Sequence, residues 1–305
     1  EPLFKHLKMR IALFGSSFNT DDTTVITTLF ERLSIYDTEV FIETRYAKLL
    51  QQHQSLAFLK TTDTWTSLDD RFDLLITIGG DGTMLRAIKH LSGFSIPVIG
   101  INTGRLGFLA TIQKKLINKA IDDLYAKQYS ISERCVLELK TDHSIEGINS
   151  NDIALNEITV SRKDTTAMVK IETFLDGDYL TSYWADGLIV STPTGSTGYS
   201  LSCGGPIVMP QSNNLVLTPI APHNLNARPL IIPDHIEITL RVSSRTEQFL
   251  VSMDSTVVSV STDTFLNINK SSQTIKMVEL NNEGFIPTLR KKLLWGEDKR
   301  NLNNN

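Results

Sequence analysis

Residues 186–206 read DGLIVSTPTGSTGYSLSCGGP, and no other stretch of the chain is as informative. It begins as an apolar strand at Leu188–Val190 and continues into a string of Thr, Ser, Pro and Gly before Tyr199. A backbone rich in glycine can approach a ligand closely because no Cβ intervenes. Hydroxyls bind sugar and base edges, and the tyrosine ring offers a flat face. The stretch therefore predicts a strand that leads into a nucleotide-binding turn, although a short string of this kind alone is also typical of a plain turn.

A second glycine-rich turn, GGDGT, occupies residues 79–83. It follows the continuous apolar run at 74–78, which predicts a strand buried on both faces, and it precedes a helical pattern. A strand, a glycine turn and a helix N-terminus together bind phosphate through backbone N–H groups and the helix dipole. No Gly-Lys-Ser/Thr follows, so the turn is not a Walker A loop, and its sequence does not match a GxGxxG fingerprint either. We expect the phosphate groups of a bound nucleotide to contact Gly79, Gly80, Gly82 and Thr83.

Asp81 is the unusual residue of this turn, because a carboxylate beside bound phosphates is electrostatically costly. It fits there if it binds a metal or accepts a proton from a nucleophilic hydroxyl. The alternative is an aspartate that caps a helix beginning at Gly82. Arg86 lies about one and a half turns further along the same helix. Its side chain either reaches back to phosphate or lies on a solvated face.

Asn156 and Glu157 lie inside a strand pattern that spans 154–160. Adjacent strand residues face opposite sides of a sheet, so both reach one pocket only if the strand bends or ends there. An Asn-Glu pair suits ribose hydroxyls, although polar strand residues also commonly face solvent. Asp254 is either a turn residue or a second carboxylate near the site, and we expect the loop residue His223 to be structural.

The distribution of apolar residues predicts two domains of different class. Strand and helix patterns alternate over about the first 125 residues, which predicts a parallel α/β sheet. From about residue 129 the apolar residues recur every second position, which predicts a β-rich, sandwich-like domain. We expect one domain at 1–128, joined by a C-terminal helix at 286–305, and a second domain at 129–285.

Composition narrows the functional class. The chain has 305 residues, 41% of them hydrophobic, and a formal net charge of −4 without a basic block, which argues against a nucleic-acid partner. No apolar run approaches the roughly 20 residues that span a bilayer, and the N-terminal EPLFKHLKMR has no apolar core of a signal peptide. Two cysteines make no disulfide framework. We expect a cytoplasmic protein without a membrane partner.

Five blocks in order along the chain resemble the NAD kinase family. They are GGDGT at 79–83, NTGRLGFLA at 102–110, NE at 156–157, the 186–206 stretch and PIAPHNLNARPL at 219–230. The resemblance implies an α/β nucleotide domain, a β-rich domain and transfer of the ATP γ-phosphoryl group to the 2′-hydroxyl of NAD's adenosine ribose. It also implies a divalent metal, Mg²⁺, that accompanies ATP, and homodimers or homotetramers with active sites near the subunit contacts.

The resemblance also assigns roles to individual residues. Asp81 matches the proton acceptor and Gly82 the phosphate-contacting turn. Asn156 and Glu157 match the pair that holds the adenosine ribose, and Asp186 matches a residue at the nicotinamide end. The adenine side matches the segment Thr197, Gly198, Tyr199, Ser200, Leu201 and Ser202. Further ligand-contacting positions are Arg86, Ala221 and Thr256.

Three positions depart from the family's pattern. Trp184 stands where many members carry a basic residue, Gly198 where alanine is common, and Ala167 where several members are polar. These departures concern contacts at the nicotinamide side rather than the reaction. Because relatives carry alanine at position 198, we expect ordinary backbone dihedrals there and a neutral or stabilising Gly198→Ala substitution.

Two other functions use similar features. A lipid or sphingoid kinase carries a related glycine turn but needs an apolar acceptor cleft, whereas TPTGSTGYSLS is polar. A non-catalytic dinucleotide sensor has no need for a carboxylate beside phosphate, so Asp81 favours an enzyme. Phosphoryl transfer passes through a loose transition state, and a carboxyl of ordinary pKa is a poor base for an alcohol. We therefore expect Asp81 to orient the 2′-hydroxyl and to take its proton late.

Overall fold

The computed structural model describes residues 8–164, 168–281 and 283–295. Its contacts divide the chain into two compact units, Glu1–Glu133 with Ile275–Asn305 (unit 1) and Arg134–Thr274 (unit 2). The sequence predicts these divisions after residues 128 and 285 instead. The difference arises because two long strands, β7 (Tyr129–Thr141) and β18 (Phe265–Leu280), begin in one unit and end in the other.

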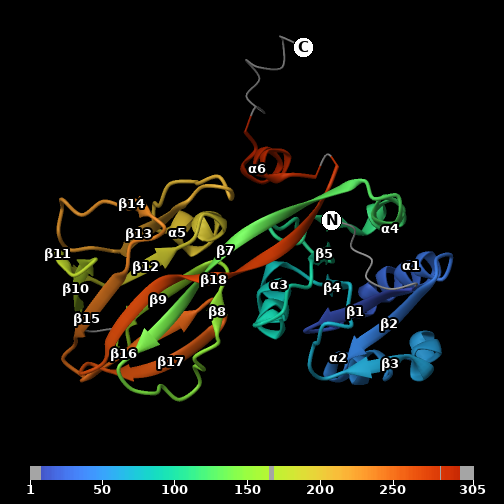
Figure 1. The fold of residues 1–305 in the computed structure, drawn as a ribbon, viewed down its shortest axis with the longest axis horizontal. Coiled ribbons are helices and arrows are strands. Elements are labelled where there is room, and N and C mark those ends of the chain that lie inside the picture. Colours follow the sequence, from blue (N-terminus) through green and yellow to red (C-terminus); the bar gives the residue numbers. More distant parts are fainter. Residues whose placement is uncertain (1–7, 165–167, 282, 296–305) are drawn as a thin grey trace, which may run out of the picture. The chain divides into compact units, whose positions relative to one another are not determined.

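Unit 1 contains a parallel sheet in the order β5-β4-β1-β2-β3 (Figure 1). Every residue of β4 is buried, which explains its continuous apolar run. The short strand β6 and the end of β18 also pair with β5, both in parallel. This sheet confirms the predicted α/β class. The strands are β1 (Met9–Gly15), β2 (Thr38–Glu43), β3 (Asp63–Trp65), β4 (Leu74–Ile78), β5 (Val98–Asn102) and β6 (Ile112–Gln113).

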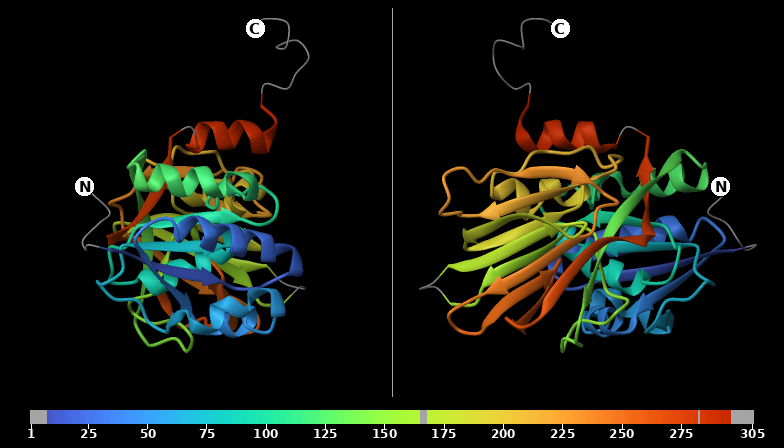
Figure 2. Two further views of the ribbon diagram at one scale, coloured as in Figure 1. Left: turned by 90° about the vertical axis from the view of Figure 1, so that its right-hand side faces the viewer. Right: turned by 60° about the vertical axis from the view of Figure 1, so that its left-hand side comes forward.

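Helices pack on this sheet through apolar faces with helical spacing. Helix α1 buries four residues in the core of unit 1 and lies beside α4 (Figure 2). Asp22 flanks α1 but does not cap it through its side chain, which instead accepts a hydrogen bond from the Asn19 backbone. The helices of unit 1 are α1 (Thr23–Leu33), α2 (Thr44–Leu50), α3 (Asp81–Ile88), α4 (Ile117–Tyr125) and α6 (Phe285–Leu293).

Two predicted helices differ from those in the structure. The apolar spacing of residues 46–59 predicts one helix, and this prediction is wrong, because α2 ends at Leu50 and a 3₁₀ segment follows at Gln54–Thr61. His53 takes an extended conformation between the two and so interrupts the helix. Helix α6 begins near the predicted start but ends at Leu293, where Leu294 adopts a left-handed conformation. The predicted helical residues 296–305 lie outside the described part of the chain.

Unit 2 is built from antiparallel strands in two sheets. One sheet has the order β14-β13-β12-β9-β16-β17, and the other contains β11-β10-β15-β18. Apolar residues of both sheets form one core cluster, for example Val160 and Leu188 with Ile171 and Leu240. The arrangement confirms the predicted sandwich-like β domain. Its strands are β8 (Ile153–Ala154), β9 (Glu157–Arg162), β10 (Val169–Leu175), β11 (Asp178–Ala185), β12 (Gly187–Ser191), β13 (Asn214–Ile220), β14 (Leu230–Pro233), β15 (Ile238–Ser243), β16 (Gln248–Met253) and β17 (Thr256–Ser261).

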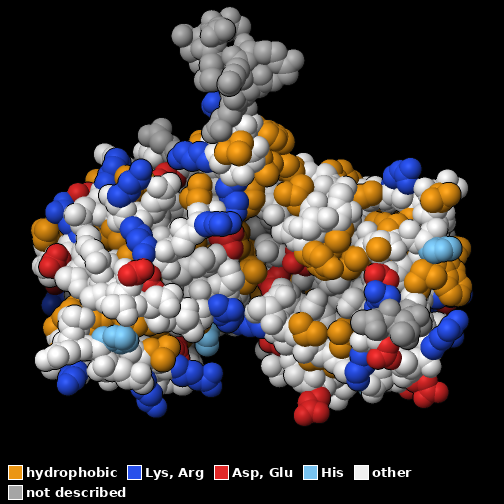
Figure 3. Space-filling model, turned by 180° about the vertical axis from the view of Figure 1, so that it is seen from behind, with side chains coloured by type: hydrophobic (Ala, Val, Ile, Leu, Met, Phe, Trp, Pro, Cys, Tyr) orange, Lys and Arg blue, Asp and Glu red, His pale blue; other side chains and the backbone are white. Residues whose placement is uncertain are grey.

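The molecular surface carries charges of both signs. On the face drawn in Figure 3, basic and acidic side chains are interspersed, in keeping with the formal net charge of −4. Over the residues that the structure describes, no helix has the length and apolarity needed to cross a membrane.

Candidate functional site

The GGDGT turn of unit 1 connects β4 to α3 as predicted. Gly79 has a φ of +148°, and a Cβ there would lie 2.4 Å from Thr83 Oγ1, so this position requires glycine. A Cβ at Gly80 would meet nothing within 4 Å, and one at Gly82 would meet only the Arg86 side chain at 3.9 Å. The N-terminus of α3 therefore lies open beside a turn without side-chain bulk, which is the geometry that binds phosphate.

A hydroxyl network joins the turn to the end of β1. Ser16 Oγ lies 2.8 Å from Thr83 Oγ1, and Arg86 Nη2 donates to Ser16 Oγ at 2.7 Å. The exposed Arg86 side chain thus folds back along α3 toward the turn instead of extending into solvent. Ser16 was not identified from the sequence, because nothing in its local pattern marks it as a neighbour of the GGDGT turn.

Asp81 binds the loop that follows β5. Its Oδ2 accepts a hydrogen bond from the Phe108 backbone N–H at 2.7 Å. Its Oδ1 accepts from the N–H groups of Leu109 and Ala110, both at 3.0 Å. The residue that caps α3 is Gly80, and no side-chain cap bond is present. The helix-cap alternative for Asp81 is therefore wrong, and the carboxylate is held by three consecutive backbone amides.

The loop that holds Asp81 is itself fixed by Asn102. This side chain, 2% exposed, donates to the carbonyls of Arg105 and Ala110 at 2.9 and 3.2 Å and accepts from Gly104 N–H at 2.8 Å. A Cβ at Gly107 would lie only 1.8 Å from Asp81 Oδ1. The sequence block 102–110 contains both residues, but their link to Asp81 is visible only in the folded chain.

The three backbone hydrogen bonds leave the Asp81 carboxylate able to accept one more hydrogen bond. An ionised carboxylate has about four acceptor positions, and the three amides take three of them. Since Oδ1 accepts two N–H groups and Oδ2 one, the remaining position is on Oδ2. The loop therefore fixes the direction of the carboxylate and leaves a single acceptor position for a ligand hydroxyl.

In unit 2, the strand expected at 154–160 is interrupted at Asn156. Strand β8 ends at Ala154 and β9 begins at Glu157. The Asp254 carboxylate accepts hydrogen bonds from the backbone N–H groups of Leu155, Asn156 and Glu157 at 2.8, 2.9 and 3.1 Å. Because the strand is interrupted here, the adjacent side chains of Asn156 and Glu157 can both reach one pocket.

Asn156 and Glu157 do face the same place. A Cβ built on Gly198 would lie 3.0 Å from Glu157 Oε2 and 3.5 Å from Asn156 Nδ2. Asn156 Oδ1 and Glu157 Oε2 are both buried and accept no hydrogen bond from any described residue. Buried acceptors without partners are costly in a protein interior, so this pair is arranged to receive donors from a ligand.

The glycine-rich stretch packs directly on the interruption. Thr192 Oγ1 donates to Leu155 O at 2.6 Å, and Thr192 N–H donates to Asn156 O at 2.9 Å. A Cβ at Gly195 would lie 2.1 Å from Asn156 O, which explains this glycine. A 3₁₀ turn (Thr194–Thr197) and the short helix α5 (Tyr199–Ser202) follow.

The predicted adenine-side residues differ in accessibility. The Tyr199 side chain is 47% exposed and Ser202 is exposed, whereas Thr197, Gly198 and Leu201 are half-buried. Ser200 is fully buried, and its hydroxyl lies 2.8 Å from Thr218 Oγ1 on β13. In this structure Ser200 thus contributes to internal packing, a role that its place in a hydroxyl-rich string does not reveal.

Burial changes the protonation of Glu157. Desolvation, reinforced by the nearby Asp254 carboxylate, raises the pKa of Glu157 to about 8, although a hydrogen bond with the Tyr199 backbone lowers it. Burial also raises the pKa of the Tyr199 phenol and of the Cys203 thiol, which hydrogen bond to each other. The Glu157 carboxyl therefore holds its proton at neutral pH in the ligand-free protein.

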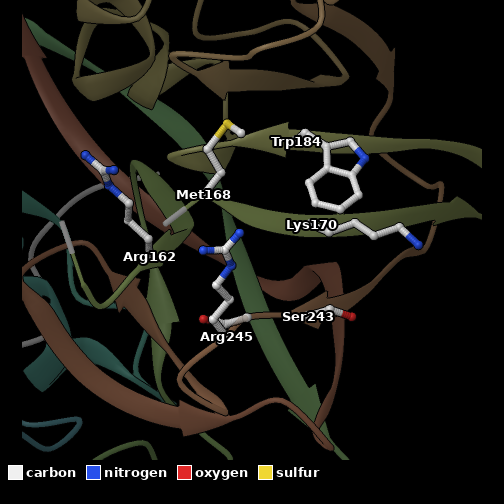
Figure 4. A pocket seen from close by; sticks show the side chains of 7 residues that line it. Arg162, Met168, Lys170, Trp184, Ser243 and Arg245 are labelled. Atoms are coloured by element: carbon white, nitrogen blue, oxygen red, sulfur yellow. The ribbon is translucent and has the colours of Figure 1, made fainter. Parts of the chain in front are cut away.

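Asp186 lies near a separate cavity at the other end of β9. Its Oδ2 is 3.1 Å from Arg162 Nη2. A cavity of about 500 Å³ opens beside Arg162, and Lys170 and Trp184, paired across β10 and β11, form another wall (Figure 4). Trp184 lines this cavity together with three basic residues, Arg162, Lys170 and Arg245, of which Lys170 lies beside it. The lining residues are Arg162, Met168, Lys170, Trp184, Ser243, Ser244 and Arg245.

The remaining predicted positions lie on loops and strand ends of unit 2. Ala221 is exposed and has a φ of +44°, an unusual conformation for a residue with a side chain. His223 donates its backbone N–H to Trp184 O at 2.8 Å. Thr256 begins β17 and is half-buried. Throughout the described ranges, no group of three or more His, Cys, Asp or Glu residues could hold a metal ion.

Family models match both units. The model of the ATP-NAD kinase N-terminal domain matches residues 11–129, and that of the C-terminal domain matches residues 155–280. The chain belongs to the ATP-NAD kinase family. The matched segments contain the GGDGT turn and its loop, the Asn-Glu pair, the 186–206 stretch and Asp254.

Relatives in this family align over almost the whole chain. An NAD kinase of Flavobacterium psychrophilum is 53% identical over 96% of this chain and 100% of its own length. An NAD kinase of Bacteroides fragilis is 40% identical over 96% of this chain and 100% of its own length. Two crystal structures share the fold at 24% identity. Yeast NADH kinase complexed with NADH has a TM-score of 0.81 and covers 96% of this chain and 90% of its own. An NAD kinase from Archaeoglobus fulgidus in complex with ATP has a TM-score of 0.72 and covers 92% and 99%.

Proposed function

We infer that this protein is an NAD kinase, which transfers the γ-phosphoryl group of ATP to the 2′-hydroxyl of the adenosine ribose of NAD. The observation that carries this inference is Asp81, held by three backbone amides at an open helix N-terminus with one acceptor position remaining. The high identity to full-length relatives named NAD kinase supports the same activity.

ATP is assigned to the turn of unit 1. Its phosphates lie on the backbone N–H groups of 79–83, and the Arg86 guanidinium, already folded back to Ser16, neutralises part of their charge. Among the described residues no group of three or more His, Cys, Asp or Glu could hold a metal ion, and we assign the Mg²⁺ ion to the ATP phosphates, which would hold it. When bound, this ion supplies further charge neutralisation for the transferred group.

NAD is assigned to unit 2. The unsatisfied Asn156 Oδ1 and Glu157 Oε2 accept hydrogen bonds from the adenosine-ribose hydroxyls, and the exposed Tyr199 ring lies on the adenine side. Asp186 contacts the nicotinamide end. Ala221 and Thr256 contribute further contacts. We assign these residues to active sites near subunit contacts of a homodimer or homotetramer.

The proposed reaction joins the two substrates. The 2′-oxygen of NAD forms a bond to the γ-phosphorus as the bond from that phosphorus to the β,γ-bridging oxygen breaks, and ADP leaves. The 2′-hydroxyl donates to the remaining acceptor position on Asp81 Oδ2, which receives the proton late in a loose transition state. Because the amides fix the carboxylate, no reorientation is required at that moment.

An assay of NADP formation tests the proposal. Purified protein with ATP, Mg²⁺ and NAD should form NADP and ADP in equal amounts. A dinucleotide sensor would bind NAD without producing NADP. A lipid kinase would consume ATP only with a long-chain acceptor, and the hydroxyl-rich turn beside Glu157 is better suited to a nucleoside.

A further inference from the structure

We propose that Asp254 is a positioning residue of the dinucleotide site, whose carboxylate holds the strand interruption that directs Asn156 and Glu157 toward one ligand. The proposal rests on the function proposed above, because it assumes that these two side chains bind the adenosine ribose. Asp254 itself is not assigned a contact with either substrate.

Asp254 reaches the strand interruption from the end of β16. Asp254 follows the last residue of β16, which pairs with β9 in the register Met253↔Ile158. Its backbone N–H donates to Glu157 O at 3.1 Å, and its side chain returns to accept the three N–H groups of residues 155–157. These bonds replace the regular ladder at the point where β9 would otherwise continue. In a continuous strand Asn156 and Glu157 would face opposite sides.

The backbone conformation at position 254 favours a short polar side chain. Asp254 has a φ of +49°, a left-handed conformation that aspartate and asparagine tolerate better than most residues. Asparagine would keep this turn and one acceptor oxygen for the N–H groups of Asn156 and Glu157. Its NH₂ group would instead face the Leu155 N–H, so that bond is lost together with the negative charge.

The charge of Asp254 also acts on Glu157. The titratable groups that face Glu157 are the Asp254 carboxylate, the Tyr199 phenol and the Cys203 thiol. Asp254 is the carboxylate among them, and its charge raises the pKa of Glu157. Removing that charge therefore lowers the pKa of Glu157, an effect that a purely structural residue would not have.

Asp254→Asn tests the proposal in the full-length protein. We expect its KM for NAD to rise about tenfold while its KM for ATP stays within about twofold of the wild-type value. In calorimetric titrations with NAD between pH 6 and 9, the midpoint of the affinity–pH curve should move to lower pH, since Glu157 binds as the carboxylate.

Asp176→Asn is the matched control. Asp176 also has a φ of +49° and accepts a backbone N–H, that of Glu237 at 2.8 Å, but it lies between β10 and β11. This variant should leave the KM for NAD and the pH midpoint unchanged.

If Asp254→Asn does not fold, Thr192→Val replaces it as the test variant. It removes the hydroxyl that donates to Leu155 O and accepts from the Gly195 N–H, so it should raise the KM for NAD without moving the pH midpoint.

Several outcomes overturn the proposal. An Asp254→Asn protein with wild-type KM for NAD and an unshifted pH midpoint shows that Asp254 does not position the pair. If Asp254→Asn raises the KM for NAD and the KM for ATP equally, and Asp176→Asn does the same, the substitutions cause a general loss of structure. If Thr192→Val leaves the KM for NAD unchanged, the strand interruption does not determine NAD binding. A wild-type protein that binds NAD but forms no NADP refutes the proposed function instead, and the calorimetric comparison still decides the role of Asp254.

Discussion

Two aspartates in different units make the same hydrogen bonds but are suited to different tasks. Asp81 accepts the N–H groups of residues 108–110, and Asp254 accepts those of residues 155–157. Around Asp81 the glycine turn is open, so its last acceptor position is available to a substrate. Asp254 lies in a hairpin turn and orders two neighbours with unsatisfied oxygens. In the first case the backbone positions the carboxylate, and in the second the carboxylate positions the backbone.

Asp81→Asn should have the largest effect on turnover. Asparagine keeps the shape of the side chain and an acceptor oxygen for the N–H groups of Leu109 and Ala110, but its NH₂ group replaces Oδ2 and cannot accept a proton. Loss of a general base typically lowers kcat by about 10²–10⁴-fold. Calorimetry should show an NAD dissociation constant close to that of the wild type. A kcat within a few-fold of the wild type would remove Asp81 from the role of proton acceptor.

Gly107→Ala tests whether the loop positions Asp81. The added Cβ would lie 1.8 Å from Asp81 Oδ1, so the carboxylate or the loop must move. A misplacement of about 1 Å can lower kcat on the order of 100-fold. Gly104→Ala is the control in the same loop, because its Cβ would meet nothing within 4 Å. If both variants keep the wild-type kcat, the loop does not position the carboxylate.

Glu157→Gln should weaken NAD binding in a pH-dependent way. Charge-assisted hydrogen bonds contribute about 1.5–3 kcal/mol, so affinity at pH 9 should fall at least tenfold. At pH 6 the wild-type carboxyl is itself protonated, because its pKa is about 8, and the difference should shrink. An NAD dissociation constant that is equal for both proteins at pH 9 would show that Glu157 binds no ribose hydroxyl.

Glu157→Gln should stabilise the folded protein at high pH, although it weakens NAD binding there. The pKa of Glu157 rises from 4.5 in the unfolded chain to about 8 in the folded protein, so the folded state binds the extra proton. The free energy of unfolding is unaffected by this group below pH 4.5 and decreases as pH rises to 8. At pH 8.5 the free energy of unfolding of Glu157→Gln should therefore exceed that of the wild type by on the order of 3 kcal/mol. At pH 4 the two proteins should be equally stable. Thermal unfolding at the two pH values measures this difference.

Gly198→Ala should have the smallest effect, and the structure changes the expectation for it. The Gly198 φ of −94° is not left-handed, but its ψ of −131° lies outside the ordinary helical and turn values that the sequence predicts. The new Cβ would lie 3.0 Å from Glu157 Oε2, at the end of a side chain that can shift. We now expect a two- to fivefold loss of NAD affinity, about 0.4–1 kcal/mol. Unchanged affinity would support the neutral substitution predicted from the sequence.

The sequence predicts features that depend on local order. The buried run of β4, the glycine turn after it and the alternating strands of unit 2 all follow from spacing along the chain. The break between α2 and the following 3₁₀ segment does not, because the apolar spacing continues across it.

What the sequence does not reveal depends on contacts between distant residues. The interruption at Asn156 is held by Asp254, 98 residues further along the chain. The requirement for glycine at position 107 comes from Asp81, and Ser200 is buried because it meets Thr218. The motifs indicate which segments form the site, whereas the directions of their side chains depend on partners that no local pattern identifies.

A single-turnover measurement of NADP formation at saturating NAD and ATP compares the two aspartates most directly. The account predicts that Asp81→Asn remains slow at saturation, because it lacks the proton acceptor, whereas Asp254→Asn reaches the wild-type rate once NAD fills the site. An Asp81→Asn protein that reaches the wild-type rate, or an Asp254→Asn protein that remains slow at saturation, would contradict this division between chemistry and binding.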